Sequence, residues 1–267
     1  MKTEKLKDLF PLEETTDKAV EIFYFFDPFC EECLRVEPVI NKLMIEYRDY
    51  IILRKILSPS LKVLTKCQAQ SSSDMDNVAL AYKAAELQGQ LKARNLLRFV
   101  QNRLVPNRSI CTSDIIRESA ELAQLDVDAF FEDMKNATVR AMLRRDLAVY
   151  REMDINENPS FVFFGGDVHE AGIKIEGIHP YYIFTHIVNG LIDFTIQKRQ
   201  LPTIFEYIEK FEVVSSAELH EVYGWRPGLL LKELSKMRLQ RLISSFETDY
   251  GVFYQLYSAP GDIRQQI

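Results

Sequence analysis

Two cysteines, Cys30 and Cys33, lie where a strongly apolar segment gives way to a helical pattern. Val20–Phe26 (VEIFYFF) is apolar except for Glu21, which predicts a central parallel strand buried on both faces. Apolar side chains then recur at helical spacing, at Val36, Val39, Ile40, Leu43, Met44 and Tyr47. The orphan amides and the positive dipole end of a helix's first turn favour a thiolate. A Cys-x-x-Cys pair in this strand-to-helix turn therefore indicates a thiol redox motif.

The same two cysteines are also compatible with half of a zinc site, or with a chance spacing. No second Cys-x-x-Cys or His-x-x-His pair follows them, and the four histidines do not cluster in the sequence. Cys67 and Cys111 stand alone, and the sequence assigns them no role. We therefore expect no metal and no cofactor.

A second constellation, at Pro159, supports the redox motif. Pro159 precedes an apolar run at residues 161–164 (FVFF), which predicts a buried strand. Residues 174–177 then alternate like an exposed strand, and residues 179–193 have the pattern of an amphipathic helix. A thioredoxin fold ends in this way, and its strand-opening proline is cis and packs beside the two cysteines. We expect the same of Pro159, although an ordinary trans proline can also begin a strand.

Between Ile51–Leu57, a second predicted strand, and Pro159 the sequence is almost wholly helical. The predicted helices are residues 77–87, 91–104, 112–123, 129–134 and 139–153, with a break at Pro106 and Asn107. A helical domain inserted between the two halves of a thioredoxin fold is the layout of the DsbA family, which residues 19–192 resemble. We expect an α/β chain: an N-terminal segment (1–18), then a DsbA-like thioredoxin domain (19–200) with its helical insertion at about 65–153.

A small C-terminal domain is predicted at residues 201–267. Its predicted elements are helices at 203–211, 217–223 and 228–242 and a hairpin of residues 243–246 and 252–257, which together describe a winged-helix-like domain. Seven basic and nine acidic residues give it a net charge of 7 − 9 = −2, whereas DNA binding needs a basic footprint. We therefore expect protein contacts, with Tyr223 and Trp225 as candidates, although both could instead pack the domain's own core.

Composition limits the compartment and the partners. The 267-residue chain has a net charge of −6, which argues against general nucleic-acid binding. No run of about 18 apolar residues exists for a membrane span, and residues 1–17 are charged and mixed, unlike a signal peptide. We expect a cytoplasmic protein that contacts neither membrane nor nucleic acid and whose thiols are kept reduced.

The run at residues 25–33 (FFDPFCEEC), together with the C-terminal domain, resembles the SpxH (YjbH) family of proteolysis adaptors. The resemblance covers nearly the whole chain. It implies a non-enzymatic adaptor that binds the transcription regulator Spx and promotes Spx degradation by the ClpXP protease, with ClpXP contacted either directly or only through Spx. It also implies that no catalytic residue is required, so that Cys30 and Cys33 are a vestigial or sensory pair. The His- and Cys-rich zinc segment of some members has no counterpart in residues 1–19.

The dipeptide between the cysteines, Glu31-Glu32, favours the adaptor over an oxidant. Two carboxylates beside a thiol oppose the helix dipole, so we expect Cys30 to titrate near an ordinary thiol. Both glutamates could equally be helix N-terminal acids with no redox role. The alternative functions are a cytoplasmic dithiol-disulfide oxidoreductase of the DsbA/FrnE type and a regulator that reads DNA through the C-terminal domain. The surface that binds a partner is not predictable beyond Phe29, Tyr223 and Trp225 as candidates.

Overall fold

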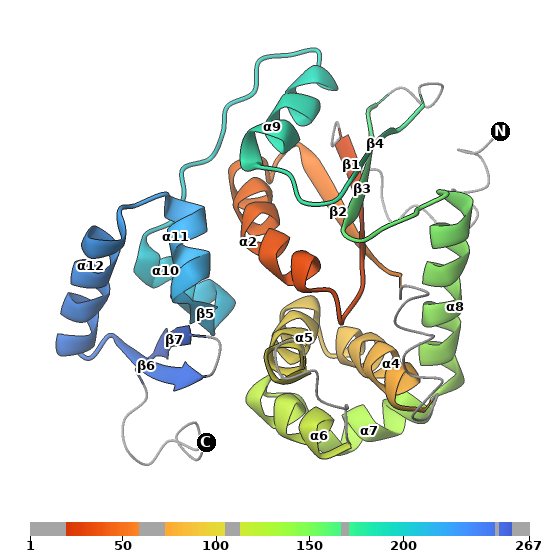
Figure 1. The fold of residues 1–267 in the computed structure, drawn as a ribbon, viewed down its shortest axis with the longest axis horizontal. Helices are drawn as coiled ribbons and strands as arrows, with labels where there is room; N and C mark the ends of the chain where they lie inside the picture. Colours follow the sequence, from red (N-terminus) through yellow and green to blue (C-terminus); the bar gives the residue numbers. More distant parts are fainter. Residues whose placement is uncertain (1–19, 59–72, 105–112, 167–170, 249–250, 258–267) are drawn as a thin grey trace. The chain divides into compact units, whose positions relative to one another are not determined.

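The computed structural model describes residues 20–58, 73–104, 113–166, 171–248 and 251–257 (Figure 1). The chain divides into two compact units. The first contains the described residues of Met1–Glu37 and Tyr47–Lys198, and the second contains those of Pro38–Glu46 and Arg199–Ile267. Helix α2 (Glu31–Glu46) is therefore divided between the units, because its first turns belong to one and its last turns to the other.

A four-stranded sheet organises the first unit. Its strand order is β2-β1-β3-β4, and the strands are β1 (Val20–Phe26), β2 (Ile51–Leu57), β3 (Ser160–Phe164) and β4 (Ile173–Glu176). β1 runs parallel to β2 and antiparallel to β3, and β4 is antiparallel to β3. Every residue of β1 except Glu21 is buried, which confirms the predicted central strand.

Alternate residues of β1 face two different layers of the first unit. One set joins α8 (Ala137–Glu152) in a buried cluster of Phe23, Phe25, Ile56, Val149, Ile155 and Val162. On the other face, Tyr24 stacks on Phe161 with ring centroids 4.7 Å apart. Phe161 in turn meets Phe184 of α9 (Tyr181–Gly190) edge to face at 4.9 Å. The period-two alternation of a strand thus places helices on both faces of the sheet.

The chain between β2 and β3 is an insertion of helices, as predicted. Within the described residues these are α4 (Ser73–Leu87), α5 (Gln90–Leu104), α6 (Ser113–Leu122), α7 (Val127–Lys135) and α8. Figure 1 shows α4 to α7 gathered beyond one end of the sheet. Asp126 caps α7 by accepting a hydrogen bond from the amide of Ala129 at 3.1 Å. The predicted break at Pro106 and Asn107 lies outside the described residues.

A buried ion pair joins two helices of the insertion. The Lys83 ammonium of α4 lies 2.6 Å from the Asp146 carboxylate of α8 and 2.8 Å from Glu86. Asp146 also accepts a hydrogen bond from the amide of Leu57, at the end of β2, at 2.8 Å. Burial lowers the pKa of Lys83, but the two carboxylates outweigh it, so the pKa lies above its ordinary value. This network ties α4, α8 and the sheet together.

The second unit combines three helices with a small sheet. Its elements after α9 are α10 (Ile204–Phe211), β5 (Val214–Ser215), α11 (Ser216–Tyr223), α12 (Pro227–Leu239), β6 (Ile243–Thr248) and β7 (Gly251–Leu256), and the strand order is β5-β7-β6. A capping box between Thr203 and Glu206 begins α10. The Ser215 hydroxyl caps α11 by accepting a hydrogen bond from the amide of Glu218 at 3.1 Å. The order of these elements resembles that of a winged-helix domain.

One buried carboxylate organises the interior of the second unit. Glu218 of α11 is 1% exposed and accepts hydrogen bonds from the Tyr207 hydroxyl at 2.8 Å and the Asn41 amide at 3.2 Å. Asn41 belongs to the part of α2 that lies in this unit, Pro38–Glu46. A buried carboxylate needs such donors because desolvation of a charge is costly, so this segment of α2 is a structural part of the second unit.

Two elements of the second unit differ from the sequence prediction. α12 ends at Leu239 instead of residue 242, because Arg241 adopts a positive φ of 57° that a continuing helix does not allow. The strand β5 was not predicted, since two residues carry no detectable alternation. Pairing with β7 defines β5, whereas α12 ends in a local turn in which the amide of Leu242 donates to the carbonyl of Met237 at 3.0 Å.

Candidate functional site

Cys30 occupies the N-cap position of α2, directly before the first helical residue. Its sulfur accepts a hydrogen bond from the backbone amide of Cys33 at 3.2 Å, as the oxygen of an N-cap serine would. The turn before it is closed by the carboxylate of Asp27, which accepts the amide of Phe29 at 2.8 Å. Cys33 is buried and Cys30 is half-buried. Both thiols are free, and the outer one alone reaches solvent.

The two thiols have opposite acidities. A hydrogen bond from the Cys33 thiol lowers the pKa of Cys30, aided by the backbone amides of Cys33 and Glu32, while burial and the charge of Asp27 oppose this effect. Burial and the neighbouring Cys30 sulfur raise the pKa of Cys33 far above its ordinary value. Cys30 is thus the thiol that ionises and can act as a nucleophile, and Cys33 stays protonated.

The expected effect of Glu31 and Glu32 on Cys30 is not what the structure shows. Both side chains are exposed to solvent, where water screens their charges. The carboxylate that raises the pKa of Cys30 is instead the buried Asp27, and it does not prevent a net lowering. The lowered pKa of Cys30 departs from the sequence-based expectation of an ordinary thiol, because that expectation did not include the hydrogen bond from the Cys33 side chain.

The Asn158–Pro159 peptide bond is cis, as predicted. It lies beside the thiol pair, because the Asn158 carbonyl accepts a hydrogen bond from the Cys30 thiol at 3.5 Å. The Pro159 carbonyl accepts the amide of Gly177 at 2.7 Å, which holds the turn against the end of β4. Pro159 and Cys30 are thus brought together from positions far apart in the sequence.

Ser58, directly after β2, holds the Asn158 side chain in place. The Ser58 hydroxyl donates to the Asn158 side-chain oxygen at 2.7 Å, and the Asn158 amide donates back to the Ser58 carbonyl at 2.6 Å. The Ser58 amide donates to the carbonyl of Phe26, the last residue of β1, at 2.8 Å. Ser58 is fully buried. This reciprocal pair, the Ser58–Asn158 clamp, connects the cis-proline turn to the ends of β1 and β2.

A second polar group lies beneath the thiols. The Tyr24 hydroxyl donates to the carbonyl of Cys33 at 3.1 Å, and burial together with the charge of Glu37 raises the pKa of Tyr24 well above its ordinary value. Glu37 forms an ion pair with Lys55 at 2.8 Å, and the Lys55 ammonium lies 5.6 Å from the centre of the Tyr24 ring.

Within the described residues, no group of three or more His, Cys, Asp or Glu side chains could hold a metal ion.

Comparison with known proteins identifies the family. A protein-family model described as thioredoxin matches residues 23–186. The ClpXP adapter protein SpxH of Staphylococcus saprophyticus is 47% identical over 236 residues, which cover 88% of this chain and 90% of that protein. The SpxH of Staphylococcus haemolyticus is also 47% identical, over 88% of this chain and 89% of its own length. The chain belongs to the SpxH family.

The fold of this SpxH-family chain also matches solved structures of DsbA proteins. The crystal structure of α-DsbA1 from Wolbachia pipientis superposes with a TM-score of 0.54 at 13% sequence identity and covers 72% of this chain and 96% of its own. At this identity the match concerns the fold alone, and it confirms the predicted DsbA-like thioredoxin fold with its helical insertion.

Sequence reasoning about this SpxH-family chain found the thiols and the proline but missed their supports. Asp27, Ser58 and Tyr24 carry no motif. The partner of Ser58 lies 100 positions away in the sequence, and the partners of Asp27 and Tyr24 are backbone groups of Phe29 and Cys33. An asparagine directly before a strand-opening proline was the one available signal for the Ser58–Asn158 clamp. The side chain of Asn158 can satisfy donors and acceptors at once, which a buried turn requires.

The candidate partner-binding residues lie in different places. Phe29 is half-buried in the turn before Cys30. Tyr223 and Trp225 belong to the second unit, where their rings meet edge to face at 5.9 Å. The Tyr223 hydroxyl donates to the carbonyl of Pro202 at 2.8 Å, so Tyr223 contributes to its own unit's packing.

Cys67 and Cys111 lie outside the described residues. No helix among the described residues is both long enough and apolar enough to cross a membrane.

Proposed function

We propose that this chain is an adaptor that binds the transcription regulator Spx and promotes its degradation by ClpXP. The observation that carries the proposal is its 47% identity, over 88% of the chain, to proteins named ClpXP adapter protein SpxH. The adaptor acts in the cytoplasm, without a catalytic step of its own, and makes contact with protein and not with nucleic acid or membrane. Spx is the client, and ClpXP engages either the adaptor or the client within the complex.

The extent of the two similarities supports an adaptor. The solved structure of α-DsbA1 superposes on 72% of this chain, and the thioredoxin family match ends at residue 186. The SpxH relatives cover 88%. An oxidoreductase fold alone therefore leaves part of the chain without a role, whereas an adaptor needs surface for a client and for the protease that receives it.

A second candidate function is dithiol-disulfide exchange, and the geometry of the thiols favours it. Cys30 has a lowered pKa and is half-buried, while Cys33 is buried and protonated beside it. That is the arrangement of an attacking and a resolving thiol. In the adaptor this pair is vestigial or sensory, and client binding does not need it.

The decisive experiment mixes purified Spx, ClpXP and ATP with the full-length chain and follows the amount of Spx over time. We expect the chain to shorten the lifetime of Spx and to remain undegraded itself. A Cys30→Ala, Cys33→Ala double variant should act to the same extent, because docking of a folded client needs no thiol. An unchanged Spx lifetime with both proteins would contradict the adaptor function.

A parallel assay tests the second candidate function, dithiol-disulfide exchange. Reduction of a disulfide-containing protein by the chain, in the presence of a reductant, measures exchange activity directly. If the wild-type chain catalyses this reaction and leaves Spx stable, then the oxidoreductase function replaces the adaptor function. If both activities are present, the double variant shows whether the thiols contribute to Spx degradation.

A further inference from the structure

Strand β4 forms one edge of the four-stranded sheet, because the strand order is β2-β1-β3-β4 (Figure 1). Gly177, directly after β4, donates its amide to the Pro159 carbonyl, directly before β3, at 2.7 Å. Successive residues of a strand direct their backbone groups to opposite sides. The amides and carbonyls of Lys174 and Glu176 therefore point away from β3. We call these outward groups the β4 edge.

The β4 edge is almost uncovered by the part of the chain that the structure describes. One described contact reaches it, from the Nε2 nitrogen of His179, which lies 2.8 Å from the Glu176 carbonyl. A carbonyl oxygen has two lone pairs, so this oxygen can accept a second hydrogen bond. Unpaired backbone groups on an edge strand are a template for another strand.

The side chains of β4 alternate between apolar and charged (IKIE). Ile173, on the apolar face, is 41% exposed. On the other face the Lys174 ammonium lies 3.4 Å from the Glu176 carboxylate. Lys174 also donates to the Asp154 carbonyl at 2.8 Å, and one oxygen of Glu176 accepts the Asn156 amide at 3.2 Å. The other carboxylate oxygen has no hydrogen bond with a described residue, so both charged groups can take a further partner.

This strand is complementary to itself when two copies run antiparallel. If the two Ile175 residues meet on a twofold axis, Lys174 of each chain stands opposite Glu176 of the other. The outward backbone groups of Lys174 and Glu176 then form the hydrogen-bonded pairs, and the two Ile175 residues form the pair between them. Opposite charges and apolar side chains that face each other across two strands are both favourable. Backbone, charge and apolar side chains thus agree on one register.

We propose that the β4 edge binds the β4 edge of a second copy of this chain, so that the two four-stranded sheets join into one sheet of eight strands. The contact is symmetric, because each copy contributes the same residues. It goes beyond the adaptor function and needs neither a client nor the thiols. A strand pair this short buries less surface than a standard interface, so we expect a dissociation constant on the order of 10–1000 µM.

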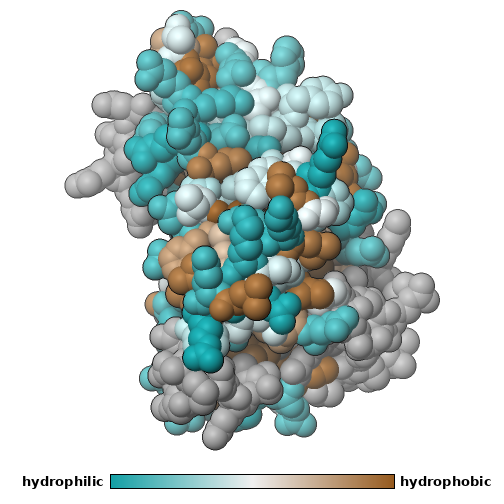
Figure 2. Space-filling model, turned by 90° about the vertical axis from the view of Figure 1, so that its left-hand side faces the viewer, coloured by the Kyte–Doolittle hydropathy of each residue, from teal (hydrophilic) through white to brown (hydrophobic). Residues whose placement is uncertain are grey.

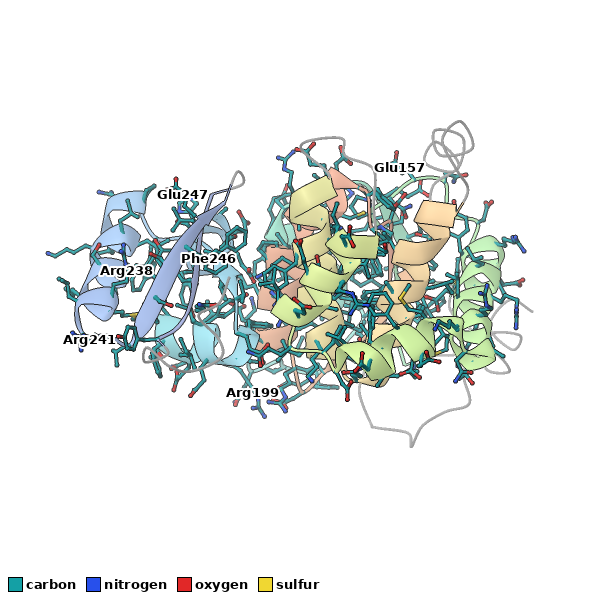
Figure 3. The ribbon with its side chains drawn as sticks, turned by 90° about the horizontal axis from the view of Figure 1, so that it is seen from below. Glu157, Arg199, Arg238, Arg241, Phe246 and Glu247 are labelled. Atoms are coloured by element: carbon teal, nitrogen blue, oxygen red, sulfur yellow. The ribbon has the colours of Figure 1, made fainter. Side chains whose placement is uncertain are left out.

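The other edges and exposed apolar side chains of the described residues lack this self-complementarity. β2, at the opposite edge of the sheet, carries Arg54 and Lys55, which are both basic. β6, an edge of the small sheet, carries one charged side chain, Glu247, beside Phe246 (Figure 3). Figure 2, which looks onto the side of the molecule that carries α12, shows brown apolar side chains divided by teal hydrophilic ones. A second copy therefore fits β4 better than it fits these surfaces.

The first test reads the register of the two strands. Ile175→Cys and Ile173→Cys are each introduced into a chain whose four native cysteines are replaced by alanine. In the proposed pair, the Cα atoms of the two residues 175 lie about 4.5 Å apart, within the range of a disulfide. The two residues 173 lie four positions apart along the strands, roughly 13 Å. We expect mild oxidation to cross-link Ile175→Cys and not Ile173→Cys, as measured by non-reducing electrophoresis. Any other pattern would overturn the proposal.

The second test measures association of the full chain with its native cysteines. Sedimentation equilibrium in a reductant, from a few micromolar to about 1 mM, should show a monomer and a dimer in exchange. Lys174→Glu places two carboxylates opposite each other at both ends of the pair and should weaken the dimer by roughly tenfold or more. Lys174→Glu, Glu176→Lys restores opposite charges and should restore association. Lys135→Glu, at an exposed lysine that also pairs with a glutamate, should behave like the wild type.

A backbone variant separates the edge from its side chains. Lys174→Pro removes one outward amide and leaves the ladder to β3 intact, since an edge strand tolerates proline where the amide faces solvent. It should abolish the dimer and leave the circular dichroism spectrum unchanged. A monomer at every concentration, or a dimer that neither Lys174→Glu nor Lys174→Pro weakens, would contradict the proposal. Neither Spx nor ClpXP takes part in these measurements, so their outcome is independent of the adaptor function, which the degradation assay tests.

Discussion

Cys30 shows how one residue can serve two purposes in a helix turn. Its sulfur replaces the oxygen of an N-cap side chain and satisfies the amide of Cys33. Hydrogen bonds that satisfy a helix end also favour the anion that accepts them. Capping geometry therefore adds to the acidity of Cys30, beside the larger effect of the hydrogen bond from the Cys33 thiol.

The first prediction concerns this acidity. In a Cys67→Ser, Cys111→Ser background, changing Cys33 to Ala should raise the pKa of Cys30, because the thiol hydrogen bond of Cys33 is the largest influence that lowers it. Changing Asp27 to Asn should lower the same pKa, since the charge of Asp27 disfavours the thiolate. Thiolate absorbance as a function of pH measures both. Cys33→Ser keeps a donor and should fall between the wild type and Cys33→Ala.

The second prediction concerns the Ser58–Asn158 clamp. Ser58→Ala should lower the free energy of unfolding by about 1–3 kcal/mol, the cost of leaving buried hydrogen-bonding groups unsatisfied. Urea denaturation measures the loss. Ser244→Ala is the control, because the Ser244 hydroxyl makes a single long hydrogen bond of 3.5 Å. Equal stability of the two variants would show that the clamp contributes nothing beyond an average serine.

At the scale of elements, local sequence was sufficient for most of the fold. β1, β2 and the insertion helices follow from apolar periodicity. Local sequence failed at β5 and at the end of α12, where pairing with β7 and the positive φ of Arg241 decide the conformation. It also gave no sign of the buried network around Lys83, because three elements far apart in the chain supply its members.

The third prediction tests that network. Lys83→Met should lower the free energy of unfolding by about 3–5 kcal/mol, because it leaves Asp146 buried without its cation. Lys135→Met, on the surface, should change it by less than about 0.5 kcal/mol. The pKa of Lys83 is raised on folding, so its contribution is fully present below the lysine pKa of about 10.4 in the unfolded chain. This contribution is lost as pH rises through the higher pKa of Lys83 in the folded chain. The wild type and Lys83→Met should therefore converge in stability at that pH.

At the scale of the whole molecule, the domain boundary is not a single point in the sequence. The predicted boundary near Gln200 separates the two units along the chain, yet the second unit also contains Pro38–Glu46. Hydrophobic patterning marks α2 as one helix and cannot indicate that its two halves belong to different units. The hydrogen bond from Asn41 to Glu218 is one of the contacts that join the later half of α2 to the second unit.

The fourth prediction follows from this division. A fragment of residues 199–267 should be unfolded or only partly folded, because Glu218 loses the Asn41 donor and the unit loses the buried side chains of that helix segment. Circular dichroism and the dispersion of amide resonances in NMR spectra measure its folding. The full chain with Asn41→Ala is the milder comparison and should fold with reduced stability. A fragment with native-like cooperative unfolding would contradict the prediction.

The division of α2 also bears on how such a protein can arise and change. A module that is continuous in sequence can be gained, lost or exchanged between genes by one recombination event at its edge. The second unit has no such edge, because part of its interior is encoded between the thiol turn and β2. A descendant that loses the C-terminal segment keeps a helix with an uncovered surface, and a gene that acquires the segment lacks the helix. The two units must therefore be inherited together, and each limits the substitutions that the other can accept along α2.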